Sequence, residues 1–125
     1  MAAFWDKLFS NDQPAPQLPP DVSADAQGLT VAEMEGEEAV YVRVPWSSIM
    51  TILAHREDVF TVAQLRLEVL TSLSEEALLI TEDDTGFDAF APQLAEHLPG
   101  VSPSWRTELA EIPVDGTPYV LFKRA

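Results

Sequence analysis

The sequence contains no cysteine and few basic residues. Without cysteine, the chain can form no disulfide, thiolate nucleophile, zinc–thiolate site or iron–sulfur cluster. Seven Lys and Arg residues stand against 21 Asp and Glu residues, which gives a formal net charge of -14 at pH 7. This charge repels the phosphate backbone of nucleic acids and anionic membrane surfaces, and it attracts basic proteins and cations. We therefore expect no direct nucleic-acid binding, and either a protein partner, for which long-range attraction favours a basic surface, or self-association through the N-terminal segment.

Targeting and membrane-spanning patterns are also missing. The N-terminal residues MAAFWDKLFSND lack the basic start, the continuous apolar core and the small-residue cleavage site of a signal peptide. No apolar run approaches the roughly 18 residues that cross a bilayer. We expect a soluble, cytoplasmic protein without integral membrane association. A length of 125 residues is enough for one domain with a hydrophobic core.

Common catalytic motifs do not occur in the sequence. It has no GxSxG, P-loop, dinucleotide-binding glycine or HExxH pattern. Of the two histidines, His55 lies in the charged segment AHRED and His97 lies near the end of a predicted helix, and neither has a companion nucleophile motif. We therefore predict no catalytic residues and no cofactor. A non-enzymatic role is favoured, and enzymatic activity stays an open alternative.

One acidic cluster follows the apolar run ALLIT. Its members Glu82, Asp83, Asp84 and Asp88 carry the oxygen ligands that Mg²⁺ and Ca²⁺ prefer. The spacing does not match an EF-hand loop, and Asp84 or Thr85 is well placed to cap the helix that follows. We predict no metal site, and these four acids are the candidates if one exists.

Residues 1–10 place Phe4, Trp5, Leu8 and Phe9 on one face of a two-turn helix. Four prolines then favour an extended linker over residues 11–28, and the strand and helix signals of the predicted domain occupy residues 29–125. We predict that the four apolar side chains bind a partner. They can dock on their own domain, on another protein or a second copy of this chain, or at a membrane interface. Deleting residues 1–28 is expected to leave a folded domain.

The apolar spacing predicts an α+β fold, with a small antiparallel or mixed sheet covered by about three helices. The sheet is expected to contain a hairpin over residues 29–44, one middle strand at 77–81 and a C-terminal hairpin around VDGT. Helices are predicted over residues 46–58, over 61–73 with Thr61 and Gln64 as a capping box, and over 87–98. Residues 105–112 have the spacing of a further short helix.

The same patterns predict which side chains form the hydrophobic core. Trp46 and Trp105 are expected to be buried. The other predicted core residues are Val40, Val42, Ile49, Leu53, Leu65, Leu70, Leu79, Phe87, Leu94 and Val120.

The net charge, and the order of an aromatic segment, a linker and a domain along the chain, together favour a non-enzymatic, acidic protein-interaction module. Two alternatives remain. One is a metal-dependent or acid/base hydrolase that uses the cluster Glu82–Asp88, and the other is an inhibitor or immunity-type protein for a basic partner.

Overall fold

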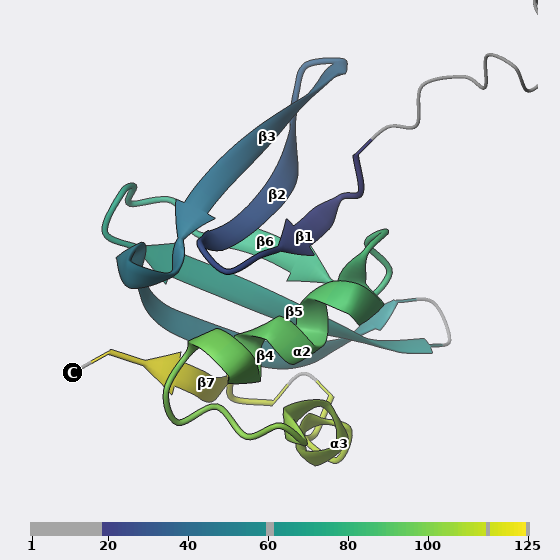
Figure 1. The fold of residues 1–125 in the computed structure, drawn as a ribbon. Coiled ribbons are helices and arrows are strands. Elements are labelled where there is room, and N and C mark those ends of the chain that lie inside the picture. The colour runs from purple at the N-terminus through teal and green to yellow at the C-terminus, as the bar shows by residue number, and fades with distance from the viewer. Residues whose placement is uncertain (1–18, 60–61, 115, 125) are drawn as a thin grey trace, which may run out of the picture.

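The computed structural model describes residues 19–59, 62–114 and 116–124, and strands dominate it (Figure 1). One antiparallel sheet has three strands in the order β1-β2-β3, namely β1 (Val22–Ala24), β2 (Gly28–Glu35) and β3 (Glu38–Pro45). A second antiparallel sheet has four strands in the order β6-β5-β4-β7. Its members are β4 (Ile49–Val59), β5 (Val62–Thr71), β6 (Leu78–Thr81) and β7 (Tyr119–Lys123).

The helical elements of the described residues are short. They are a single 3-10 turn, η1 (Trp46–Ser48), and the helices α2 (Phe87–His97) and α3 (Trp105–Leu109). Helix α2 lies against the four-stranded sheet and beside β1 (Figure 1). The core lies between α2 and the two sheets, and its most deeply buried side chains include Leu29, Val31, Ile52, Leu67, Phe90 and Leu94.

The predicted α+β fold with about three helices is wrong. Residues 46–58 form η1 and most of β4, and residues 61–73 contain β5. In both strands, buried side chains alternate with more exposed ones, as Leu65, Leu67 and Val69 show in β5. The two strands pair along β4 from Ile49 to Val59. Some apolar residues here are also spaced as on one face of a helix, but strand pairing and the two-residue alternation decide the conformation.

The predicted C-terminal hairpin is wrong as well. Strand β7 pairs with β4, where Val120 lies opposite Leu53, and the described residues around VDGT contribute only an isolated bridge between Val114 and Arg56. Val120 is 51% exposed because it lies beside Leu53 on the face of the sheet away from the core, whereas Phe122 of the same strand lies beside the buried Ile52 and is itself buried.

Other local predictions are confirmed. The hairpin over residues 29–44 corresponds to β2 and β3, the middle strand to β6, and the clearest helix to α2, which continues through Pro92. The further short helix is α3.

The core predictions have mixed outcomes. Ile49, Leu65, Phe87 and Leu94 are buried, as are Trp46 and Trp105. Val42, Leu53 and Leu70 are only half-buried. Val40, Leu79 and Val120 are exposed, and Leu79 is exposed because its neighbours Leu78 and Ile80 occupy the core side of β6.

Strand β1 lies within residues 11–28, which the sequence suggests are a linker. Val22 is fully buried, and its backbone N–H donates to the Thr85 carbonyl at 3.1 Å. Gly86, at the start of α2, has φ of +86°, and a Cβ there would lie 2.2 Å from the Val22 carbonyl oxygen. The folded part of the chain therefore begins before Leu29.

Candidate functional site

The four acids proposed as metal candidates do not converge on one point. A Glu82 carboxylate oxygen accepts the Leu65 backbone N–H at 2.8 Å, and Asp83 accepts a hydrogen bond from the side-chain amide of Gln64. Asp88 pairs with Arg106 of α3 at 3.1 Å. Each of these carboxylates therefore has a local structural partner.

Asp84 stabilises a turn rather than the helix end. Its carboxylate accepts the Thr81 backbone N–H at 2.9 Å, and its backbone carbonyl accepts from Phe87. The prediction that Asp84 or Thr85 caps the helix is wrong, because Gly86 is the N-cap residue and no side chain caps α2. Within the described ranges, no group of three or more His, Asp or Glu side chains is arranged to hold a metal ion.

Gln64 also has a different role from the predicted one. The residue lies in β5, and its buried side chain joins β5 to the loop after β6 through Asp83. The capping-box prediction for Thr61 and Gln64 fails because β5, not a helix, begins there; Thr61 itself lies outside the described residues.

Both histidines lie beside other side chains of the folded domain. His55 lies in β4 with its ring nitrogens 3.5 Å from Glu57 and 3.5 Å from Glu68, and its side chain is 17% exposed. His97 stacks on Trp46 with ring centroids 4.9 Å apart, and Gln93 Oε1 accepts a hydrogen bond from its Nε2 at 3.0 Å. Neither ring has a serine, threonine or tyrosine hydroxyl among these contacts.

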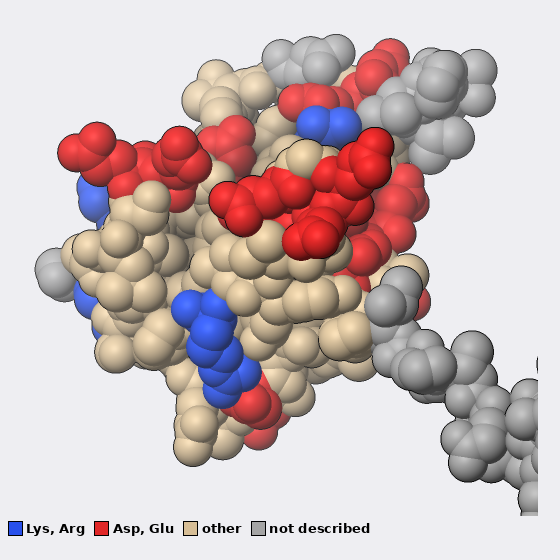
Figure 2. Space-filling view, turned by 90° about the horizontal axis from the view of Figure 1, so that it is seen from above, with Lys and Arg blue, Asp and Glu red and all other residues tan. Residues whose placement is uncertain are grey.

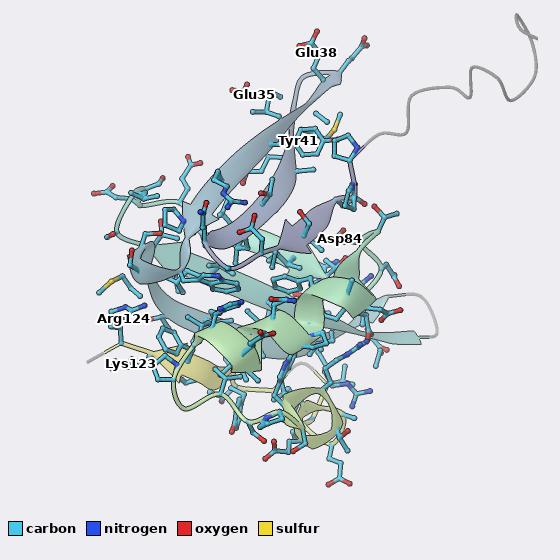
Figure 3. The ribbon with its side chains drawn as sticks, viewed as in Figure 1. Glu35, Glu38, Tyr41, Asp84, Lys123 and Arg124 are labelled. Atoms are coloured by element: carbon cyan, nitrogen blue, oxygen red, sulfur yellow. The ribbon has the colours of Figure 1, made fainter. Side chains whose placement is uncertain are left out.

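The most distinctive surface is the outer half of the β2–β3 hairpin, residues 32–41, which we call the acidic arm. Strand β1 pairs with β2 only over Leu29–Val31, so beyond that point β2 has β3 as its sole strand neighbour. The arm rises above the other elements in Figure 1, and Figure 3 places Glu35 and Glu38 at its outer end.

Exposed carboxylates and apolar side chains share this arm. Its acids are Glu33, Glu35, Glu37 and Glu38, and all four are exposed. Figure 2 shows acidic side chains gathered on the side from which the arm projects. The arm also exposes Met34 by 66%, Val40 by 38% and Tyr41 by 37%. Methionine and tyrosine are among the residue types that are enriched at protein interfaces.

The arm's four glutamates form no ion pair with any residue that the structure describes. Every arginine already has partners elsewhere: Arg43 binds Asp25, Arg66 binds Glu57, Arg106 binds Asp88, and Arg56 and Arg124 donate to backbone carbonyls. Lys123 lies at the opposite side of the molecule from the arm in Figure 3. The negative charge of the arm is therefore not neutralised by these cations.

Two of these glutamates oppose each other directly. Glu35 and Glu38 are partners in the β2–β3 register, on either side of the turn at Gly36. Like charges at directly opposite positions of an antiparallel pair destabilise it. The outer end of the arm thus contains a repulsive pair that a bound cation would relieve.

The base of the hairpin is stabilised by an ion pair of its own. The Arg43 guanidinium lies 2.8 Å from Asp25 and, with the backbone N–H groups of Gln27 and Gly28, lowers the pKa of Asp25 to about 2. Asp25 follows β1 and Arg43 belongs to β3, so this pair links the two edges of the three-stranded sheet.

The predicted partner-binding residues Phe4, Trp5, Leu8 and Phe9 lie outside the described residues, so their role stays a prediction. No helix of the described part is long and apolar enough to cross a bilayer. Comparison with protein-family models, with curated proteins and with solved structures gave no match for this chain.

Proposed function

We propose that this chain is a non-enzymatic protein-interaction module that binds a basic partner through the acidic arm. The observation that carries this proposal is the group of four exposed glutamates on a projecting hairpin, none of which pairs with a described cation. With a net charge of -14, the chain attracts a basic surface over distances up to the Debye length, about 8 Å at physiological salt.

The repulsion between Glu35 and Glu38 supports the same conclusion. A two-stranded ribbon is marginally stable in water, and an opposed pair of like charges weakens it further. A lysine or arginine from a partner placed between these carboxylates would replace repulsion with attraction. A cationic partner therefore stabilises the arm more than it would stabilise a surface on which the same charges were dispersed.

Exposed apolar side chains on the arm add a short-range contribution. Ala32 pairs with Tyr41 and Met34 pairs with Ala39, so Met34 and Tyr41 lie on one face of the arm, opposite to the face of Glu35 and Glu38. Methionine and tyrosine are enriched at protein interfaces, and their burial against a partner supplies affinity that charge alone does not. We propose that the charges steer the partner and that these side chains hold it.

The predicted segment with Phe4, Trp5, Leu8 and Phe9 is proposed as a second, independent contact with the partner or with another copy of the chain. A chain that begins at Pro19 lacks this segment but keeps the residues of every described strand. A partner that is lost on truncation but retained by an arm variant would assign binding to this segment.

The test of the arm is affinity capture from the native cell, with the full-length chain and two matched double variants. Glu35→Lys with Glu38→Lys reverses two charges on the arm, and Glu96→Lys with Glu111→Lys makes the same change in net charge at exposed positions elsewhere. We expect the arm variant to lose a basic partner that the control retains, and we expect wild-type capture to weaken at high salt. Equal capture by both variants would show that the arm is not the binding surface.

A further inference from the structure

A cavity lies where the base of the acidic arm meets the loop between β5 and β6. Its volume is about 210 Å³. Val42 and Val44 of β3 form one wall, while Leu73 and Leu78, at the two ends of the β5–β6 connection, form the other. The cavity therefore lies between the two sheets, on the face of the hairpin that continues outward from the core.

The lining of this cavity combines four apolar side chains with two glutamates and with the hydroxyl residues Thr71 and Ser74. Val44 and Leu78 are buried, Val42 is half-buried, and Leu73 is exposed. Glu33 of β2 and Glu76 of the β5–β6 loop contribute carboxylates to the lining. Both glutamates are exposed, and neither forms an ion pair with a described residue.

We propose that this cavity receives a lysine or arginine side chain of the protein partner. The aliphatic part of that side chain packs on Val42, Leu73 and Leu78, and its cationic end reaches the carboxylates of Glu33 and Glu76. This inference rests on the proposed function, because it identifies the group by which a basic partner is anchored at the base of the arm.

The size and chemistry of the cavity favour a basic side chain over other occupants. A volume of about 210 Å³ is below the ~300–1,000 Å³ of typical small-molecule sites, so it suits a single side chain. Lysine and arginine combine an apolar stem with a cationic end, which matches a lining of apolar side chains and two exposed carboxylates. A purely apolar side chain would leave Glu33 and Glu76 to lose water without an ionic partner.

The probes for this test are two acetylated and amidated peptides that differ at one residue. One contains a single lysine between alanine and serine residues, and the other has norleucine in its place, which keeps the stem and removes the charge. Each is titrated into the full-length, ¹⁵N-labelled protein. We expect the lysine peptide to give saturable amide shifts at Val42, Leu73 and Leu78, and the norleucine peptide to give none.

Matched variants separate the cavity from the general charge of the protein. Glu33→Gln with Glu76→Gln should weaken the lysine peptide about two- to five-fold for each carboxylate removed, the range that exposed ion pairs give. Glu96→Gln with Glu111→Gln removes the same charge at exposed positions outside the cavity and should leave binding unchanged. Leu73→Ser should also weaken binding, and since Leu73 is 64% exposed it should not affect folding.

Failure of this inference and failure of the proposed function give different results. If the lysine peptide gives no saturable shift up to about 10 mM, or if both peptides bind equally, the cavity is not a cation site. The proposed function still stands in that case if the arm variant loses its partner. If lysine binding is lost with Glu33→Gln and Glu76→Gln but not with the control pair, the cavity is the anchor site.

Discussion

The opposed pair Glu35 and Glu38 makes a quantitative prediction about stability. Replacing Glu35 by Lys converts a repulsive cross-strand pair into an attractive one, and such pairs contribute roughly 0.2–1 kcal/mol each. Because both positions are exposed and screened by solvent, we expect the free energy of unfolding to rise by about 0.5–1 kcal/mol. Urea denaturation of the full-length chain at pH 7 measures this change, and the gain should shrink at high salt.

A control variant separates the local pair from the overall charge. Glu111→Lys changes the net charge equally at an exposed position without an opposed glutamate in a strand. A chain of net charge -14 gains some stability from any such reversal, so the prediction concerns the difference between the two variants. If Glu35→Lys stabilises no more than Glu111→Lys, the Glu35–Glu38 repulsion does not exist in solution.

The same variant also tests function. Glu35→Lys should stabilise the chain and weaken capture of the basic partner, because the charge that destabilises the arm is the charge that binds. A natural sequence that keeps a destabilising pair commonly does so at a functional site. Greater stability with undiminished capture would contradict the proposed role of the arm.

Three further predictions concern the base of the hairpin and α2. In urea denaturation, Gly86→Ala should lower the free energy of unfolding by at least about 2 kcal/mol and Gly100→Ala by about 1 kcal/mol. Both glycines have φ of +86°, but only at Gly86 would a Cβ meet another backbone atom. Equal losses in the two variants would contradict this close approach. Val22→Ala should cost about 2 kcal/mol, and an unchanged midpoint would show that β1 is not packed. Arg43→Gln should raise the pKa of Asp25, which carboxyl ¹³C NMR measures. Because the ion pair lowers this pKa from 3.8 to about 2, the pair stabilises the fold above pH 4, and this contribution is lost as the pH falls through 2.

The elements that the sequence predicts correctly have strong local signals. The β2–β3 hairpin alternates apolar and polar residues around Gly36, and α2 has a long stripe of apolar side chains from Phe87 to Leu94. These patterns arise within a single element or a two-residue turn, so neighbouring residues are enough to specify them.

The β4–β5 hairpin could not be recognised in the same way. Val59 pairs with Val62, and the two residues between them in the sequence, Phe60 and Thr61, include none of the Gly, Asn, Asp or Pro residues that mark tight turns. Without a turn signal, the apolar residues on either side fit helical spacing as well as alternation. The strand conformation is decided by pairing with other strands: β5 pairs with β6, which follows it after residues 72–77, and β4 pairs with β7, which lies far away in the sequence.

The candidate site was only partly visible in the sequence. Acidic composition predicts a basic partner, but not which acids meet it. Val40 was expected in the core, and it does lie on the core-side face of the hairpin, opposite Glu33, yet beyond the point where the core ends. One sequence signal marks that point: along β2 the same face changes from Leu29 and Val31 to Glu33 and Glu35.

The continuity of these strands links binding at the arm to the stability of the whole sheet. Strands β2 and β3 run without interruption from the buried pair Leu29 and Val44 to the repulsive pair Glu35 and Glu38. A partner that binds only the folded arm must therefore raise the unfolding free energy, by about 2.7 kcal/mol at a hundredfold excess over Kd. Since the core anchors one end of both strands, the unbound arm stays folded despite the repulsion between Glu35 and Glu38, and a bound cationic side chain removes that repulsion.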